Sequence, residues 1–325
     1  MAHSCCPWPT RNQSLLQALS DMRILVLGGS GQIGWELQRS LAPLGEILAP
    51  LRAELDLLDL AALRAAIRRV GPSVIVNAAA YTDVDRAQSE PDLARELNTL
   101  VPAVLALEAR ELGALLIHYS TDYVFDGSKA RPYLEEDAPH PLNVYGVTKL
   151  EGDEAIKGLH GLFVILRTSW VYGLRRPCFV TRVLALARRN SQLRFATDQI
   201  GSPTWCRTVA QATTGLLART SEQGFEWLRG QTGLYHLACR GWVDRYGWAR
   251  EILNLDPDKR EQTVKEVDRA SSADFASSAQ RPTFSALDSS RFAQVFGIRL
   301  PEWGKALRLA MRTRSGPGEV PSRPS

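Results

Sequence analysis

The chain has 325 residues, of which 45% are hydrophobic and 23% charged, and its formal net charge is +4. This composition predicts a globular protein with one large domain or two modest ones. The basic residues are scattered, without a long Lys/Arg run or a nucleic-acid-binding motif. No apolar run is long enough to span a membrane, so neither a nucleic acid nor a membrane is expected as a partner.

The two ends differ in composition from the rest of the chain. Residues 1–21 have no uninterrupted apolar core and make a poor signal peptide, whereas "MRILVLGGSGQIG" reads as a complete protein start at Met22. We expect 1–21 to be a disordered N-terminal extension and the Gly/Pro/Ser-rich 314–325 to be a disordered tail. The five cysteines, an odd number without metal-type spacing, favour free thiols and a cytoplasmic location.

Apolar strand patterns alternate with helical patterns in the first half of the chain. Strands are expected at 23–29, 46–50, 73–80, 114–121 and 162–173. Helices are expected at 31–45, 58–71, 92–113 and 145–158, with Pro102 kinking or dividing the third of them. This order predicts a Rossmann-like, doubly wound α/β fold in which helices cover both faces of a parallel sheet.

The alternation weakens after residue 174. Helices are expected at 179–190, 206–219, 243–253 and 302–313, with strands at 193–199 and 234–239 and a polar, Ser/Ala-rich stretch at 267–280. We therefore predict a dinucleotide-binding domain at 22–174. A smaller C-terminal α/β domain at 175–313 would mainly bind substrate, with some segments returning to the main sheet.

The first strand runs into the glycine-rich stretch "GGSGQIG". Gly28, Gly31 and Gly34 are spaced so that the backbone can approach a pyrophosphate at the N-terminus of the following helix. A tight strand–helix turn in another α/β protein is the alternative. Because the motif follows a strand, opens a helix and begins a strand–helix series, dinucleotide binding is favoured.

The end of the second strand bears on cofactor preference. The stretch "ILAPLRAE" lacks the acidic residue that usually accompanies NAD, and Arg52 lies there instead. Arg52 would pair with the 2′-phosphate of NADP, or it is a solvated arginine; the sequence leaves both open. Asp56 is a candidate contact at the adenine side of the site.

Polar residues follow the fourth strand in "HYSTDYVFDG". Thr121 and Asp122 should face the cofactor crevice, because ligands bind beyond the carboxyl ends of parallel strands, although such residues also commonly cap turns. In "YGVTK", Tyr145 and Lys149 share one helix face. By themselves these two residues allow three interpretations: a solvated surface pair, a packing contact, or a phenol whose pKa is shifted by the lysine ammonium. His118, inside the apolar strand, is expected to pack or cap.

Several longer stretches resemble the dTDP-4-dehydrorhamnose reductase family of the extended short-chain dehydrogenase/reductases. They are "GGSGQIGWELQRSLAPLG", "VNAAAYTDVDRAQSEP", "IHYSTDYVFDG", "PLNVYGVTKLEGD", "RTSWVYG", "DQIGSPT" and "QRPTFSALD". Their order and spacing also fit, over residues 22–313. The resemblance implies reduction of the C4 ketone of dTDP-4-dehydro-β-L-rhamnose to dTDP-L-rhamnose with NADPH or NADH, the last step in making this activated sugar for bacterial polysaccharide.

The resemblance also implies roles for individual residues. Tyr145 would donate the proton. Lys149 would tune the acidity of Tyr145 and hold the nicotinamide ribose, and Thr121 would bind the substrate oxygen. The further cofactor contacts it implies are Gly31, Gln32, Ile33, Asp56, Leu57, Ala80, Tyr81, Thr82 and Tyr119. The substrate contacts it implies are Thr121, Asp122, Tyr145 and Trp170. Histidine is more usual than Tyr81, but a backbone contact would survive that change.

Physical chemistry supports the tyrosine–lysine pair. A free phenol has a pKa near 10, and a close ammonium would lower it, which would make the phenol a better acid as hydride arrives at the ketone. Four arginines are weaker candidates. Arg175, Arg176 and Arg207 would meet a substrate diphosphate, and Arg281, in "QRP", would be structural.

The resemblance breaks down at a metal site. Some family members are magnesium-bridged dimers through glutamates. Glu36 matches one such position, but "RRNSQL" (188–193) and "LAMRT" (309–313) lack the other glutamates. A Mg²⁺ site and that dimer mode are therefore in doubt, and a homodimer stays open. Two other functions also stay open: a reductase or epimerase of another nucleotide-sugar, and a non-catalytic subunit like the beta subunit of methionine adenosyltransferase.

Overall fold

The computed structural model describes residues 22–312, so the predicted extension and tail lie outside the described residues. At its centre is a six-stranded sheet of order β10-β5-β4-β3-β1-β2, with every pairing parallel. The strands are β1 (Arg23–Leu27), β2 (Glu46–Leu48), β3 (Val74–Asn77), β4 (Leu115–Thr121), β5 (Phe163–Thr168) and β10 (Gly233–His236). The predicted doubly wound fold is confirmed, and β10 comes from beyond residue 174.

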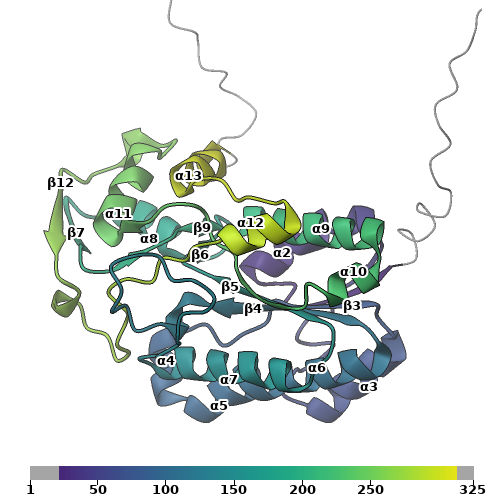
Figure 1. Ribbon diagram of the computed structural model, residues 1–325. Helices are drawn as coiled ribbons and strands as arrows, with labels where there is room; N and C mark the ends of the chain where they lie inside the picture. The colour runs from purple at the N-terminus through teal and green to yellow at the C-terminus, as the bar shows by residue number, and fades with distance from the viewer. Residues whose placement is uncertain (1–21, 313–325) are drawn as a thin grey trace, which may run out of the picture.

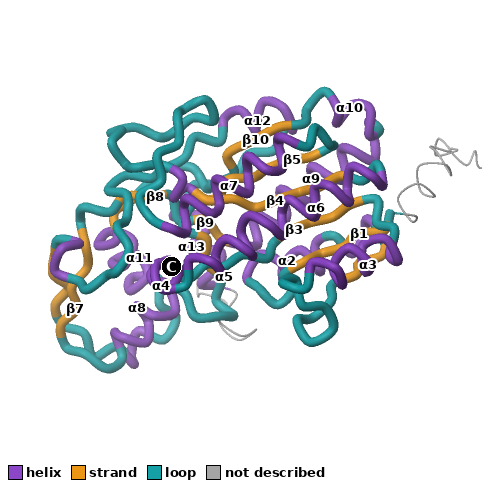
Figure 2. Tube along the Cα trace, turned by 90° about the horizontal axis from the view of Figure 1, so that it is seen from below, coloured by secondary structure: helices purple, strands orange, loops and turns teal. Residues whose placement is uncertain are grey.

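Both faces of this sheet are apolar. Along β1, Ile24 and Val26 pack into one core and Leu25 and Leu27 into another, because successive side chains of a strand point to opposite faces. Helices α2 (Gln32–Ser40) and α9 (Cys206–Gln223) cover the first face, and α3 (Leu60–Val70), α6 (Val101–Leu112) and α7 (Val144–Gly158) cover the second (Figures 1 and 2). The sheet is thus buried on both sides.

The expected helix at 92–113 is divided ahead of Pro102. After α4 (Val84–Ser89), α5 (Pro91–Arg95) passes into a π-helical turn at Glu96–Leu100 and then into α6. The Val101 N–H donates to the Glu96 carbonyl, five residues back, and Pro102 has no N–H for the usual bond. The wide turn carries the buried Asn98 towards the ligand side of the sheet.

The single strand expected at 162–173 is wrong. β5 ends at Thr168, and β6 (Val171–Tyr172) pairs with β9 (Thr204–Trp205) instead of the main sheet. Between them Trp170 has a φ of 43°, which a strand cannot contain and which is uncommon for a residue with a side chain. The chain therefore turns at the carboxyl edge of the sheet, a point that apolar periodicity does not reveal.

The later segments form a lobe beside this edge, on the left of Figure 1. It holds α8 (Phe179–Ala187), α11 (Arg245–Asn254), α13 (Trp303–Arg312), β7 (Gln192–Ala196), β8 (Ile200–Gly201), β11 (Val243–Asp244) and β12 (Glu266–Ala270). β12 pairs with β7, so the polar, Ser/Ala-rich stretch from residue 267 begins within a strand. α10 (Phe225–Arg229) and α12 (Ser290–Phe296) lie nearer the sheet. The division at residue 174 stays a prediction.

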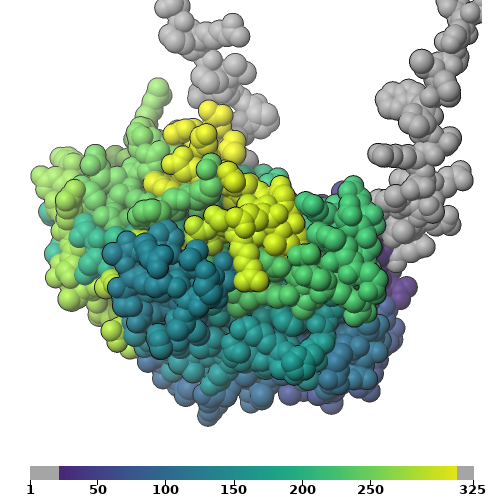
Figure 3. Space-filling view, in the orientation of Figure 1, coloured from purple at the N-terminus to yellow at the C-terminus, as the bar shows by residue number. Residues whose placement is uncertain are grey.

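Segments far apart in sequence meet on the surface in front of the sheet. Tyr133, in the loop before α7, donates a backbone hydrogen bond to the Ala286 carbonyl and accepts one from the Asp288 N–H. Figure 3 shows the C-terminal segment, in yellow, lying against this part of the surface. The loop before the "YGVTK" helix is therefore held by residues near the end of the chain.

Two further findings concern the described residues. None of their helices is long and apolar enough to cross a membrane. Cys178, Cys206 and Cys239 are free thiols; Cys5 and Cys6 lie outside the described part.

Candidate active site

A cavity of about 1040 Å³ opens at the carboxyl ends of β1, β3, β4 and β5. This is where a doubly wound sheet binds its ligand, since the strand order reverses between β1 and β3. Nearly all the candidate residues line it: Gly28, Gly31, Gln32, Ile33, Arg52, Asp56, Leu57, Ala80, Tyr81, Thr82, Tyr119, Thr121, Asp122, Tyr145, Lys149 and Trp170. Gly34 is the exception and lies beneath the turn. The structure brings the candidates together, and their individual roles stay predictions.

The glycine-rich turn is shaped by two close approaches. Gly28 has a φ of 76°, and a Cβ there would lie 2.6 Å from the Ala79 backbone nitrogen. A Cβ on Gly34 would overlap the Gly28 carbonyl oxygen. The turn is closed by the Gly31 N–H, which donates to that same carbonyl at 2.9 Å. The free N–H groups at the start of α2 therefore face the cavity, where a pyrophosphate fits.

Tyr81 lines the cavity and is held through its backbone by Asn98. Its N–H donates to Asn98 Oδ1 at 2.9 Å, and its carbonyl accepts from Asn98 Nδ2 at 3.2 Å. The phenol instead donates to Glu90 at 2.6 Å. The expected backbone contact between Tyr81 and the cofactor stays a prediction. Asn98 also donates to Thr148 of α7 at 3.1 Å, so the π-helical turn links the β3 loop to the helix of "YGVTK".

Tyr145 and Thr121 face each other in the middle of the cavity. Burial raises the pKa of Tyr145 above its ordinary value, and a hydrogen bond from the Thr121 side chain opposes this only in part. Thr121 also accepts from the Tyr123 N–H at 3.2 Å, the capping role that sequence left open. Lys149 is not among the groups that shift this pKa, and the Asp122 and Asp153 carboxylates raise it further, so the expected lowering of the tyrosine pKa by lysine is wrong for the protein alone.

Lys149 is fixed by the strand beneath it instead of by Tyr145. Its Nζ lies 2.7 Å from the Tyr119 carbonyl oxygen and 2.9 Å from His118 Nε2. Asn77 Nδ2 lies 3.0 Å from the other ring nitrogen of His118. Burial lowers the pKa of Lys149 to about 8, although the Asp153 carboxylate opposes the shift. His118 thus packs as a buried polar residue, and it also positions the lysine.

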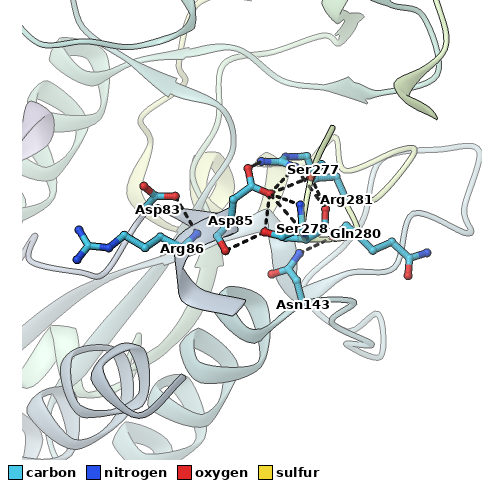
Figure 4. A network of polar contacts seen from close by, with 9 residues as sticks. Asp83, Asp85, Arg86, Asn143, Ser277, Ser278, Gln280 and Arg281 are labelled. Atoms are coloured by element: carbon cyan, nitrogen blue, oxygen red, sulfur yellow. Dashed lines mark hydrogen bonds and ion pairs between the residues drawn. The ribbon is translucent and has the colours of Figure 1, made fainter. Parts of the chain in front are cut away.

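The first turn of α7 is anchored from outside the helix. Asn143 caps it by accepting from the Gly146 N–H at 2.9 Å, and its side-chain nitrogen donates to the Gln280 carbonyl at 2.8 Å (Figure 4). Asp85 of α4 receives the Ser278 and Ala279 N–H groups, both at 3.1 Å, and pairs with Arg281. The segment 277–281 therefore joins α4 to the turn that carries Tyr145, which gives Arg281 the structural place expected for it.

The other end of the cavity is lined by side chains of later segments. Asp122 accepts from Ser285 and Ser169, and burial raises the pKa of its carboxyl to about 6. Trp170 stacks on Trp248 with ring centroids 5.5 Å apart. Phe179, Trp248 and Arg245 also line this end. Sequence reasoning missed these three because each lies in an ordinary amphipathic helix and faces the cavity only through tertiary packing.

Of the three arginines considered for a substrate diphosphate, Arg176 lines the cavity beside the glycine-rich turn, and Arg175 and Arg207 are not among the lining residues. Arg175 and Arg176 both donate to the Ser30 carbonyl, at 2.6 and 2.8 Å, beside the glycine-rich turn. Arg207 pairs with Glu36 at 3.1 Å. Within residues 22–312, no group of three or more His, Cys, Asp or Glu side chains is placed to hold a metal ion. Glu36, the residue that raised the question of magnesium, is bound by an arginine.

Comparison with known proteins agrees with this geometry. Residues 22–315 match the RmlD substrate binding domain family. The chain belongs to that family. A dTDP-4-dehydrorhamnose reductase of Burkholderia thailandensis is 38% identical over 296 residues, 90% of this chain and 98% of the relative. This RmlD-family fold also superimposes on solved structures.

Two of these solved structures are dTDP-4-dehydrorhamnose reductases. One, from Clostridium acetobutylicum, has a TM-score of 0.80 and 32% identity. The other, from Bacillus anthracis in complex with NADP, has a TM-score of 0.81 and 29% identity. Each comparison covers 90% of this chain and 99% of the other. The RmlD-family likeness therefore extends over the cavity and both groups of segments around it.

Proposed function

We propose that the chain reduces the C4 ketone of dTDP-4-dehydro-β-L-rhamnose to dTDP-L-rhamnose, with NADPH as hydride donor. One observation carries the proposal: Tyr145, Thr121 and Lys149 lie midway along a single cavity that begins at a dinucleotide turn and ends at Trp170. The relatives that match nine-tenths of the chain bear the name of this reductase. A cytoplasmic location and a homodimer stay predictions.

The residues of the chain divide the reaction between them. NADPH, when bound, supplies the hydride. The Tyr145 hydroxyl, kept protonated by burial, gives its proton to the ketone oxygen as negative charge develops there. The Thr121 hydroxyl donates to the same oxygen and stabilises that charge. Lys149, held by β4, orients the nicotinamide ribose and offsets the charge left on Tyr145.

The residues present fit a phosphorylated dinucleotide. The glycine-rich turn and the start of α2 suit a pyrophosphate, and Arg176, on the Ser30 carbonyl, adds a positive charge beside them. Arg52 is exposed, lines the cavity after β2 and forms no ion pair within the described part of the chain. It is therefore available for the 2′-phosphate that distinguishes NADPH from NADH.

The function is tested by following NADPH absorbance with purified protein and dTDP-4-dehydro-β-L-rhamnose, and by identifying the sugar product by NMR. We expect NADPH loss matched by dTDP-L-rhamnose. No loss with this sugar but turnover of another dTDP-hexulose would reassign the substrate. Binding of an enzyme partner, without turnover of any sugar, would overturn the reductase proposal in favour of a regulatory subunit.

Cofactor preference is tested with Arg52→Ala. We expect the dissociation constant of NADPH to rise roughly tenfold or more, as one charge-assisted contact is lost, while that of NADH barely changes. Arg176→Ala is the matched comparison, since it should weaken both cofactors alike through their shared pyrophosphate. Equal effects of Arg52→Ala on the two cofactors would contradict a 2′-phosphate contact.

A further inference from the structure

Arg245, the first residue of α11, stands among aromatic rings at the end of the cavity far from the glycine-rich turn. Its guanidinium carbon lies 3.4 Å from the centroid of the Trp170 ring and 4.9 Å from that of Phe179. Trp170 and Phe179 in turn stack on Trp248, at 5.5 and 4.6 Å. The planar guanidinium is held by these ring faces, so its position is fixed before any ligand arrives.

The guanidinium of Arg245 is not in direct contact with a carboxylate of any residue that the structure describes. Arg281, its neighbour across Tyr123, is paired with Asp85 at 2.5 Å. Among the ion pairs of residues 22–312, Arg245 takes part in none, and its polar neighbour is the Tyr123 hydroxyl. The Asp122 carboxylate also acts on Arg245, but without an ion pair, because its oxygens accept from Ser169 and Ser285. A partly buried guanidinium that lines the cavity without an ion-pair partner is suited to an anionic ligand.

Arg245 is also separated suitably from the proton donor. Tyr123 makes an edge contact with Tyr145, with centroids 5.8 Å apart, and its hydroxyl lies towards Arg245. The phenol side chain of Tyr123 thus spans the distance between Tyr145 and Arg245. A pyranose ring is comparable in size to a phenol, and a 4-keto sugar carries its diphosphate on C1, across the ring from the ketone.

We propose that Arg245 binds the diphosphate of the nucleotide-sugar substrate, with Trp170 beneath the guanidinium fixing its plane. The inference rests on the proposed function and adds the residue that selects a phosphorylated sugar. It also assigns the two ends of the cavity to different phosphates. Arg176 and the glycine-rich turn face those of the cofactor, and Arg245 faces those of the substrate.

The test is calorimetric titration of the full chain, saturated with NADP⁺, with dTDP and separately with thymidine. Arg245→Met keeps much of the packing against Trp170 without the charge. We expect it to weaken dTDP roughly ten- to hundredfold, as expected for losing hydrogen bonds to a charged group, and to leave thymidine and NADP⁺ binding unchanged. Arg245→Lys should fall between Met and the native residue, because it keeps the charge without the planar fork.

Arg250→Met is the matched control, since Arg250 is an exposed arginine of the same helix that stacks on Tyr246. It should bind both probes as the native protein does. Equal weakening of dTDP and thymidine by Arg245→Met would overturn the proposal and make Arg245 a support for the base. Unchanged dTDP binding would overturn it too. If the native chain bound no dTDP, the proposed function would fall with it.

Discussion

The two ends of the cavity are built in different ways. The cofactor end consists largely of backbone: a glycine-rich turn, the N-terminus of α2 and the loop after β3, whose carbonyls and N–H groups are fixed by neighbouring backbone or by Asn98. The sugar end consists of side chains, with Trp170, Phe179, Trp248 and Arg245 brought together from separate segments.

This difference predicts how each end tolerates change. At the cofactor end, where backbone lines the cavity, there is no space for an added atom, but most of the surrounding side chains can be substituted. At the sugar end, where side chains line the cavity, ligand binding depends on the identity of each residue, and the backbone beneath is free to differ. One dinucleotide-binding frame can therefore serve many sugars, with specificity set in the later segments.

The largest effect is expected where the two ends meet. Tyr145→Phe removes the proton donor and keeps the ring that packs on Tyr123. We expect kcat to fall by a factor on the order of 10² to 10⁴, while the NADPH dissociation constant stays nearly unchanged. Stopped-flow NADPH oxidation and cofactor titration measure the two. A near-normal kcat would show that the phenol is not the donor.

The backbone end is tested with Gly34→Ala. The new Cβ would overlap the Gly28 carbonyl, so the turn must open. We expect the free energy of unfolding to fall by about 1–3 kcal/mol and NADPH binding to weaken. Gly158→Ala, at the end of α7 with open space around its Cβ, is the control and should be neutral or slightly stabilising. Equal outcomes for the two variants would erase the proposed contrast.

A smaller effect is expected from pH. With the pKa of Lys149 lowered to about 8, its ammonium is present below that pH and lost above it. We therefore expect kcat/KM for NADPH to fall as pH rises through about 8. Asp153→Asn removes the carboxylate that raises this pKa, so the fall should begin at lower pH. A profile flat to the ordinary lysine range, near 10, would contradict this.

The smallest effect concerns the segment that anchors α7. Asp85→Ala removes the acceptor of the 277–281 segment, and because Asp85 is partly exposed we expect a loss of only about 1 kcal/mol near neutral pH. Arg281 lowers the pKa of Asp85, so this stabilisation is full above the ordinary aspartate pKa, near 4, and is lost as the pH falls towards the depressed value. Asp92→Ala, an exposed change on α5, is the control. It should leave the midpoint of urea unfolding unchanged both near neutral pH and below the ordinary aspartate pKa.

The sequence predicted what depends on local spacing. Gly28, Gly31 and Gly34, and the pair Tyr145 and Lys149, stand in patterns that one turn or one helix explains, and the structure brings them to one cavity. Apolar alternation likewise predicted the main sheet. The positive φ of Trp170 and the place of Arg245 depend on packing between distant segments, which periodicity does not encode. The raised pKa of Tyr145 follows from burial, which spacing does not reveal.

The position of β10 has a consequence for dissecting the protein. This strand, from Gly233 to His236, is hydrogen-bonded along β5, which comes before residue 174. A fragment ending at 174 would leave β5 as a bare sheet edge, with unpaired N–H and C=O groups and the apolar surface that α9 normally covers. Such a fragment should aggregate instead of folding into a free cofactor-binding module. Truncation is therefore unsuited to assigning roles in this chain, and point substitutions in the intact protein are needed.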